Sequence, residues 1–578
     1  MDIKNLESKL PAFATQYLGD DMKERGYQLA FQLQPIKDIH LKSRYDYELA
    51  GNGDMTYLKY LGMAALFILF IAWINYVNLS TAHSLDRSKE VGIRKVVGAG
   101  KFQLIRQFLA ESLFLNLFAL ALGYLAFRLT LPAFSKLIEK EISFSQFMDW
   151  QFWLLVTGLL LLGTLLAAFY PAFVLSSFQP VYSIKNSKGG GGQAGGKSLL
   201  RKSLVVVQFT AAVVLITAAL GFYRQLKFMQ NRDLGVDINQ TLVVQQTANQ
   251  DSTDIPAFVA FVNDVQSQSG VVSVTASTSV PGGEVGGSSD FNLKNAQSGK
   301  RCRTLGIDNK FIPSYGLEIV AGRNFTNDRP AGDTAQLLNV LVNETAAKIF
   351  GFTQAAEILG QEIDGGGVHC RVIGVVRDYH QESLQYGFDP IVFYPEEERN
   401  FGNFSIKLNT DQLNVLMESV KIKWQNYFPD SPFRYFFLDD QFNAQYKNDR
   451  LFATVLWLFT VLALIIASLG LFGLSLFTIA KRNKEISIRK VLGATVVQII
   501  GLVTTEYIKL VLIACLIALP LAYWLVNQYI RGYAFHIDLG LWFILLPVIM
   551  ITSIALFTVF YQSFRAGMAN PVKHLRME

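Results

Sequence analysis

Seven stretches of the chain are apolar over the length that a helix needs to cross a bilayer, which is about 20 residues. They are 58–80, 108–131, 152–175, 203–223, 451–480, 507–529 and 541–563. A buried helix of a soluble protein is shorter and carries polar residues along one face. The pattern therefore predicts a multi-span α-helical membrane protein with seven spans.

The long polar stretch between the fourth and fifth spans, residues 224–450, predicts a mixed α/β domain. Residues 271–277 alternate like a strand, and residues 370–376 are a β-branched run that follows a glycine-rich turn. Residues 254–270 and 410–428 have the apolar spacing of amphipathic helices. The predicted fold class is thus a helical membrane part with a mixed α/β extracytoplasmic domain.

The polar segments between the spans carry opposite charge on the two sides of the membrane. Four of them together contain 18 Lys and Arg but only 5 Asp and Glu. These basic segments are 83–104, 176–203, 481–506 and 564–578. The short segments on the other side, 132–151 and 530–540, contain 3 basic and 4 acidic residues. Because Lys and Arg are enriched in cytoplasmic loops, we expect a cytoplasmic C-terminus, with residues 1–57 and 224–450 outside.

The overall composition supports this topology. Charged residues make up 17% of the chain and apolar residues 51%, whereas a soluble protein carries roughly 25% charged residues. The net charge of +6 is concentrated in the cytoplasmic segments, so it indicates membrane orientation and not a nucleic-acid surface. We therefore expect a multi-pass protein of the cytoplasmic (inner) membrane, in contact with the lipid bilayer and without a nucleic-acid partner.

A cytoplasmic motif occurs twice, at an offset of 395 residues. The first copy, KEVGIRKVVGA, begins at Lys89, and the second, KEISIRKVLGA, begins at Lys484. Each copy follows one predicted span and leads into the next, as an internal repeat should. Both are predicted to form a short helix, after which Gly and Ala restart a helix. The same residues in the same order favour docking to a soluble partner over anchoring to lipid headgroups, for which charge alone is sufficient.

A weaker similarity relates residues 6–20 to residues 417–430. Both are predicted to be helical and to precede a short strand, at 29–36 and at 433–438. A parent with two halves, each made of one span, an external domain and three spans, accounts for the pattern. We therefore expect residues 1–57 to be the remnant of a first external domain, and this chain to lack the first span and most of that domain.

The repeat divides the chain into six predicted segments. They are a remnant of a first extracytoplasmic domain (1–57), a first three-span unit (58–175), a cytoplasmic Gly-rich linker (176–202), a single span (203–223), the external domain (224–450) and a second three-span unit (451–578). We expect residues 440–450 to join the external domain to the fifth span as one continuous helix.

The two motifs, the span pattern and the external domain resemble the permease subunit of MacB/FtsX-like ABC transporters. Residues 311–325 and 372–384 are similar to that family's external domain, which is known as the MacB-like periplasmic core domain. The resemblance covers nearly the whole chain. It implies that the cytoplasmic motif docks in a groove of a separate ABC ATPase. The docking role then falls on Glu90, Ile93, Arg94, Lys95, Gly98, Ala99, Glu485, Ile488, Arg489, Lys490, Gly493 and Ala494.

The resemblance further implies mechanotransmission, in which closure of the ATPase dimer moves the external domains without necessarily carrying a substrate through the membrane. The chain itself would be non-catalytic, with ATP hydrolysis on the partner chain. We expect two permease copies to assemble with two ATPases for export or efflux of an unknown extracytoplasmic substrate, such as a peptide, lipoprotein or antibiotic. The alternative is an FtsX-type regulator of a cell-wall hydrolase, although two full halves argue against its smaller architecture. A secondary transporter would need ionisable residues near mid-span, which are almost lacking in this sequence.

No catalytic, cofactor-binding or metal-binding residue is predicted. Residues 191–198 fit the pattern GxxxxGK[ST], but they lie in the Gly-rich linker without the preceding strand that a phosphate-binding loop requires. A flexible linker is the preferred interpretation. The histidines show no metal-type spacing; they are His40, His83, His369, His380, His536 and His574. Cys302 and Cys370 both lie outside, where a disulfide could form, and the sequence leaves that pairing open.

Overall fold

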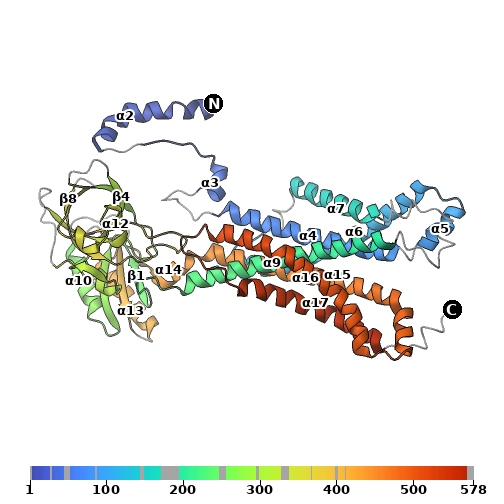
Figure 1. The fold of residues 1–578 in the computed structure, drawn as a ribbon. Helices are drawn as coiled ribbons and strands as arrows, with labels where there is room; N and C mark the ends of the chain where they lie inside the picture. Colours follow the sequence, from blue (N-terminus) through green and yellow to red (C-terminus); the bar gives the residue numbers. More distant parts are fainter. Residues whose placement is uncertain are drawn as a thin grey trace. The chain divides into compact units, whose positions relative to one another are not determined.

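The computed structural model divides the chain into two compact units (Figure 1). Unit 1 comprises Met1–Gly53, Leu226–Asn448 and Arg531–His536, and unit 2 comprises Asp54–Gln225, Asp449–Ile530 and Ile537–Glu578. The residues that the structure describes are 3–25, 29–43, 53–84, 88–142, 149–170, 194–246, 255–294, 299–326, 337–365, 368–396, 401–409 and 412–568.

Long apolar helices cover the described residues of all seven predicted spans. They are α4 (Met55–Ser84), α6 (Lys101–Ile138), α7 (Trp150–Tyr170), α9 (Ala194–Asn231), α15 (Lys447–Val491), α16 (Val496–Ile530) and α17 (Trp542–Met568). Six of these helices are long and apolar enough to cross a membrane. The exception is α7, whose apolar stretch Trp150–Leu166 is shorter, so the structure supports six spans and the seventh stays a prediction.

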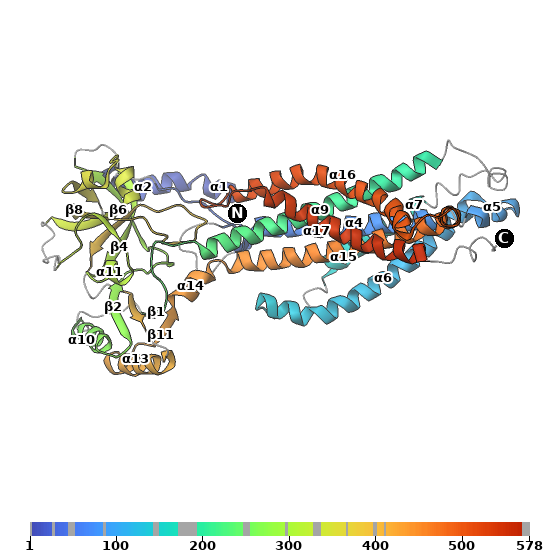
Figure 2. The ribbon, with the colours of Figure 1, turned by 60° about the horizontal axis from the view of Figure 1, so that its bottom comes forward.

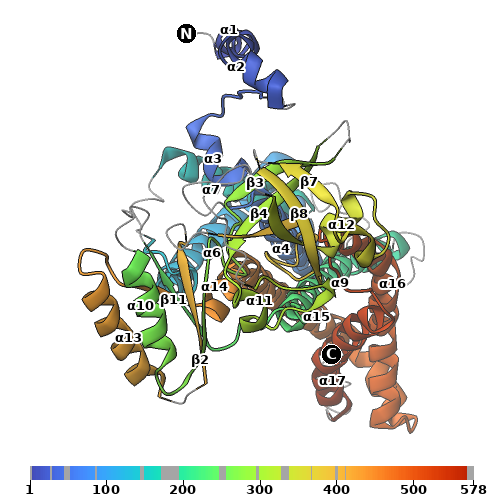
Figure 3. The ribbon, with the colours of Figure 1, turned by 90° about the vertical axis from the view of Figure 1, so that its left-hand side faces the viewer.

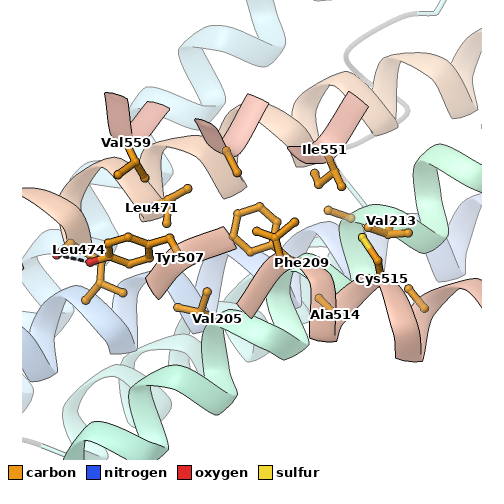
Figure 4. Close-up of a cluster of buried hydrophobic side chains, with 14 of the residues drawn as sticks. Val205, Phe209, Val213, Leu471, Leu474, Tyr507, Ala514, Cys515, Ile551 and Val559 are labelled. Carbon is orange, nitrogen blue, oxygen red and sulfur yellow. Dashed lines mark hydrogen bonds between the residues drawn. The ribbon is translucent and has the colours of Figure 1, made fainter. Parts of the chain in front are cut away.

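Four helices of unit 2 pack side by side around an apolar core. Helices α9, α15, α16 and α17 run along one another in two views (Figures 1 and 2). Phe209 of α9, Leu471 of α15, Ala514 of α16 and Ile551 of α17 are all buried in one cluster (Figure 4). The hydroxyl of Tyr507 lies in this cluster and donates to the Leu474 carbonyl at 3.4 Å. This hydroxyl therefore has a backbone partner inside the low-dielectric bundle.

The described strands of the external domain in unit 1 form one eleven-stranded sheet, and four antiparallel strands make up one end of it. Their order is β11 (Arg434–Phe437), β1 (Thr241–Gln245), β10 (Asn403–Leu408) and β2 (Val271–Ser277). Helices α10 (Ile255–Gln266) and α13 (Leu413–Tyr427) pack on this sheet (Figure 3). Their amphipathic spacing places Phe261 and Trp424 in a shared aromatic core, where the two rings meet edge to face at 5.4 Å.

The rest of the same sheet, joined to the first part by the pairing of Ser277 with Ile307, contains a closed ring of six strands. The ring follows the order β4 (Lys300–Ile307), β3 (Gly287–Leu293), β7 (Glu362–Gly365), β8 (Val368–Val376), β6 (Leu338–Asn343) and β9 (Ile391–Pro395). A parallel pairing of β9 with β4 closes it, with Ile391 opposite Arg303. Val340 and Val372 are fully buried in its core. Closure leaves these strands without an open edge.

Shorter elements complete the described part of the chain. They are α1 (Ile3–Glu7), α2 (Leu10–Arg25), α3 (Ile36–Lys42), α5 (Ser88–Val96), α11 (Phe311–Ser314), β5 (Ile319–Gly322), α12 (Glu344–Ile349), a 3₁₀ helix η4 (Ala355–Ile358) and α14 (Leu438–Ala444). β5 extends the sheet by pairing with β8.

The strand predicted at 29–36 is wrong. Residues 29–35 have no regular structure, and α3 begins at Ile36. A strand needs a neighbour to satisfy its backbone groups, and no strand among the described residues pairs with this segment. Its apolar alternation, with Leu29, Phe31 and Leu33 all exposed, is therefore not sufficient to form a strand.

The continuous helix predicted over 440–450 is also wrong, because the chain turns between α14 and α15. The turn contains Gln445 and Tyr446. Tyr446 is 1% exposed, and its hydroxyl accepts a hydrogen bond from the Leu384 amide at 3.2 Å. The Gln445 side chain donates to the Gly282 carbonyl at 2.9 Å. These long-range contacts fix both side chains in the external domain and favour a turn over a straight helix.

Candidate docking site

The predicted docking residues lie in two helix–turn–helix segments of unit 2. In the first, α5 ends at Val96 and α6 begins at Lys101. In the second, α15 ends at Val491 and α16 begins at Val496. We name these segments the first and the second docking turn.

The short separate helix expected in both copies forms only in the first. In the second copy, the motif is the end of α15, a single helix of 45 residues. Ile486 is buried in the same cluster as Ile479 of the span, so the helix stays in contact with the core beyond the membrane segment. Packing therefore continues α15 from the span into the motif, where the sequence predicted a separate short helix.

Each docking turn is closed by a glycine in a left-handed conformation. The φ angle is +103° at Gly98 and +95° at Gly493. In both turns the amide of the next residue, Ala99 or Ala494, donates to the carbonyl of the motif arginine at 2.9 Å. This arrangement is a glycine C-cap, which satisfies carbonyl groups at the end of a helix. The Gly-Ala pair of the motif is thus explained by backbone geometry, and the two copies share it closely.

Buried apolar residues fasten each turn to the helix that follows it. Val91 and Ile486, which correspond through the repeat offset, are both 4% exposed. Leu104 and Ile499, which also correspond, are both buried. The two turns therefore share buried apolar residues at the same positions, just as they share the backbone geometry at the glycine.

The outer face of each turn carries exposed apolar side chains, which we call the apolar ridges. Their exposure ranges from 46% at Ile488 to 82% at Val97. The ridge residues are Ile93, Val96 and Val97 in the first turn and Ile488, Val491 and Leu492 in the second. Exposed apolar groups gathered on a polar surface mark an interaction site. The prediction from sequence named only the two isoleucines. The other four residues are apolar at equivalent positions of both motif copies, and this pattern could have identified them.

The charged docking residues differ more between the turns. Arg94 donates to the Gln107 side chain at 2.6 Å, and Gln107 donates to Glu111 at 2.9 Å. Arg489 instead forms an ion pair of 2.7 Å with Glu485, one helical turn before it. Lys95 and Lys490 are both half-buried, whereas the Glu90 side chain lies outside the described side chains.

Glu506 joins three helices beside the second turn. Its carboxylate is 2.8 Å from Lys202 of α9 and 3.0 Å from Arg482 of α15. Glu506 lies 395 residues after Glu111, which is the offset of the repeat. The structure places Glu506 between two cations, which gives the second turn a charge-based support.

The phosphate-loop pattern falls at the start of α9. Residues 191–193 lie outside the described residues, and the side chains of 194–198 are also not described. The helix begins at Ala194, so the last part of the predicted linker 176–202 is helical. A helix at this point does not follow a described strand, and the pattern has no structural support for nucleotide binding.

The cysteines and histidines of the external domain are explained by burial and by contacts within the domain. Cys302 and Cys370 are free and buried, and burial raises the pKa of each thiol to about 12. The expected possibility of a disulfide between them is therefore not realised.

Burial, together with the nearby Arg232, lowers the pKa of His380 to about 4. The His369 ring nitrogen Nδ1 is 2.7 Å from Asp364. The described residues contain no group of three or more ligands that could hold a metal ion.

The external domain also contains a cavity of about 260 Å³, lined by Phe258 of α10, Phe404 of β10 and Asp308 after β4. Asp308 accepts hydrogen bonds from the Thr275 hydroxyl and, at 3.0 Å, from the Ala276 amide. Burial raises the pKa of Asp308, and these hydrogen bonds oppose that effect. The carboxylate therefore serves the fold of the domain, and the docking turns remain the stronger candidate site.

Family comparisons match both parts of the chain. The FtsX-like permease C-terminal family matches residues 62–180 and 457–571, and the MacB-like periplasmic core domain matches residues 205–423. The two FtsX-like matches begin 395 residues apart, which is the offset of the repeat.

Individual relatives are distant. A probable syringafactin export ATP-binding/permease protein of Pseudomonas syringae is 25% identical over 41% of this chain and 35% of its own length. The permease YknZ of Bacillus subtilis is 23% identical over 38% of this chain and 55% of its own length. The macrolide export protein MacB of Campylobacter jejuni (strain 81-176) is 22% identical, covering 49% of this chain and 45% of its own length. The chain thus spans about a third to a half of the length of these curated relatives.

Among solved structures, the periplasmic region of MacB from Actinobacillus actinomycetemcomitans covers 37% of this chain and 96% of its own, at 19% identity and a TM-score of 0.27.

Proposed function

This chain belongs to the MacB/FtsX-like permeases of ABC transporters, and we propose that it is a non-catalytic membrane subunit that docks a separate ABC ATPase through both of its cytoplasmic turns. The observation that carries the proposal is the duplicated geometry of those turns. Each combines a glycine cap, a buried anchor and an exposed apolar ridge beside a basic pair. A partner with two equivalent subunits, as an ABC ATPase dimer has, would meet the same surface twice.

We further propose that the chain transmits the stroke of the ATPase to its external domain. Helix α9 is uninterrupted over 38 residues. At 1.5 Å per residue it is about 57 Å long, well beyond the roughly 30 Å of a hydrocarbon core. A displacement at the cytoplasmic end of such a helix is carried along its whole length. In this scheme seven spans place the C-terminus in the cytoplasm and residues 224–450 outside, as the charge pattern predicts.

Export or efflux of an extracytoplasmic substrate is the function that we favour. Two of the reported relatives are described as export proteins, one for syringafactin and one for macrolides, which supports the class of process but not a particular cargo. A peptide, a lipoprotein and an antibiotic remain the substrate classes that we propose. The FtsX-type regulator is not favoured, since the external domain matches the MacB-like core domain over residues 205–423.

Charge reversal in the docking turns tests the proposal. The tagged chain is expressed with the ABC ATPase encoded in its own gene cluster, and the ATPase retained on the purified chain is quantified. We expect the double variant Arg94→Glu/Arg489→Glu to lower retention by more than about tenfold, because the proposed contact of each arginine with the partner is replaced by a side chain of opposite charge.

A matched control separates docking from lipid anchoring. The double variant Lys481→Glu/Arg565→Glu reverses the same number of exposed cytoplasmic charges outside the motif. Docking predicts nearly unchanged retention for this control, whereas anchoring by charge predicts an equal loss in both double variants. Equal losses would therefore contradict the proposed role of the turns.

A further inference from the structure

The sheet of the external domain divides at one point, where β2 and β4 separate. The two strands share a single pairing, of Ser277 with Ile307. From there the four-stranded part and the ring extend in different directions (Figures 2 and 3). Asp308 bridges the gap beyond the pairing: its amide donates to the Ala276 carbonyl at 3.2 Å, and its carboxylate accepts from the Ala276 amide at 3.0 Å. We call this point the fork of the sheet.

The cavity of about 260 Å³ lies at the fork and has walls from both parts of the sheet, so we call it the fork cavity. Phe258 and Phe404 belong to the core of the four-stranded part, where their rings stack with centroids 5.2 Å apart. Phe325, after β5, and Glu396, after β9, line the cavity from the side of the ring. An occupant would therefore touch both parts of the domain at once.

Aromatic rings make up most of the apolar wall. Four phenylalanines line the cavity, and all of them are buried: Phe258, Phe325, Phe401 and Phe404. Val259, which is 42% exposed, and the exposed Lys310 also line it, so the cavity opens to solvent. A preformed hollow with an apolar wall and a few polar groups is typical of a small-molecule site. Since a cavity of about 150 Å³ holds benzene, the fork cavity has room for roughly ten non-hydrogen atoms.

The charged groups of the wall favour a cation. Among its described residues, two carboxylates, Asp308 and Glu396, stand against one ammonium, that of Lys310. Burial raises the pKa of Asp308, so a positive charge nearby would stabilise its ionised form. The faces of phenylalanine rings also attract cations. A cation that carries an aromatic group would thus find both a charge partner and an apolar wall.

We propose that the fork cavity binds a small organic cation, an aromatic group of about ten non-hydrogen atoms that carries one ammonium. The ring packs against the phenylalanines, and the ammonium lies toward Glu396 and Asp308. This inference goes beyond the proposed docking function and does not depend on it, because every residue involved belongs to the external domain.

Ligand-observed fluorine NMR on the full chain in lipid nanodiscs tests the site. The probe is 4-fluorophenethylamine, and 3-(4-fluorophenyl)propionate is the matched anion with the same ring and a similar length. Empty nanodiscs give the signal change due to lipid alone, which is subtracted. We expect the chain to bind the cation at least about fivefold more tightly than the anion. Equal binding of the two probes, or no binding of the cation, would overturn the proposal.

A neutral isostere in the wall locates the bound cation. Glu396→Gln keeps the shape of the side chain and removes its charge, so affinity for 4-fluorophenethylamine should fall by about fivefold. Glu418→Gln, the matched control, removes a carboxylate from α13, outside the wall, and should bind as the parent does. Equal affinities in the two variants would place the bound cation outside the fork cavity and overturn the proposal.

Charges at the mouth give a second test that leaves the core intact. Val259 is exposed on α10, so Val259→Lys and Val259→Glu should both fold. Affinity for the cation should fall by about threefold with lysine and rise by about threefold with glutamate. The same two substitutions at Val415, which is 68% exposed on α13, should change nothing. Shifts of the same sign with both charges at position 259 would contradict the proposed site.

The same chemical group occurs as a free amine and at the N-terminus of a peptide. The amide of 4-fluorophenylalanyl-glycine carries the ring and the ammonium on a short peptide and serves as the second probe. Weaker binding than that of 4-fluorophenethylamine assigns the cavity to small amines, and equal or tighter binding assigns it to peptide N-termini. In both cases Glu396→Gln should weaken the tighter probe, and a probe that binds this variant unchanged would refute the proposal.

Discussion

The two docking turns present the same surface on different supports. Both have a glycine in the left-handed conformation and an exposed apolar ridge. In both, the amide of the next alanine donates a hydrogen bond of 2.9 Å to the carbonyl of the motif arginine. The first turn begins in a separate helix, α5, whereas the second is the end of α15. Beside the first turn Arg94 bonds to Gln107, and beside the second Glu506 lies between Lys202 and Arg482.

This difference indicates which features a partner would read. The repeated features are the backbone turn and its outward apolar groups, both of which a docked protein would touch. The features that differ lie behind the turn, where they determine how firmly it is held. We therefore expect substitutions on the ridges to act equally in the two turns, and substitutions behind them to act on one turn only.

The largest effect is expected from a charge on a ridge. Val97→Asp and Leu492→Asp each place a carboxylate where the partner would exclude water, at a cost of about 3 kcal/mol for a residue central to an interface. Each variant is combined with charge reversal of the other turn, so that one site is measured at a time. Affinity for the ATPase should fall by more than about a hundredfold in both cases.

Val97→Thr is the matched control, because it keeps the shape of valine and adds no charge. Its affinity should stay within several-fold of the parent. If Leu492→Asp weakened binding no more than this control does, the second ridge would not be a docking surface and the equivalence of the turns would fail.

A smaller effect is expected from an added Cβ at the capping glycines. No atom lies within 4 Å of a Cβ built at Gly98 or Gly493, so Gly98→Ala and Gly493→Ala meet no steric obstacle. Their cost comes from a φ near +100°, which L-residues disfavour by about 1 to 2 kcal/mol. Hydrogen exchange of peptides that cover each turn should accelerate by a similar factor in both variants. If exchange accelerated much more in one variant than in the other, the contacts behind the less affected turn would be absorbing the backbone strain that the alanine introduces.

Periodicity in the sequence was sufficient to locate most helices of the membrane unit and the local elements of the external domain. The helix predicted at 410–428 appears as α13, and the strand predicted at 271–277 appears as β2. These elements depend on the spacing of their own apolar residues. The same holds for the turns, where a glycine before an alanine predicts a helix end.

Features that depend on distant contacts could not be predicted. The parallel pairing that closes the ring joins Arg303 to Ile391, and neither segment specifies the other. The turn before α15 arises because Tyr446 meets Leu384, and the failed strand at 29–36 lacks a neighbour. In the candidate site, exposure separated the ridge valines from the buried Val91, although all of them are apolar in the sequence.

The smallest effect is expected from the charge behind the second turn. Glu506→Gln removes the ion pairs to Lys202 and Arg482, whose side chains are 43% and 35% exposed. Solvent screening at such exposure limits the loss to about 1 kcal/mol. Glu485→Gln, the matched control, removes only the surface pair with Arg489 and should cost about 0.3 kcal/mol.

Hydrogen exchange at low and high salt measures this support directly. In the parent chain, protection of residues 485–498 should fall as salt rises, because salt screens the two ion pairs of Glu506. Glu506→Gln should lower that protection and remove most of its salt dependence. The first turn, residues 88–104, should exchange as in the parent, since Glu506 contacts only the second half of the repeat and α9 in these pairs. Faster exchange in both turns would contradict this expectation. It would show that the loss of Glu506 also loosens the first turn, so that the two turns are mechanically coupled.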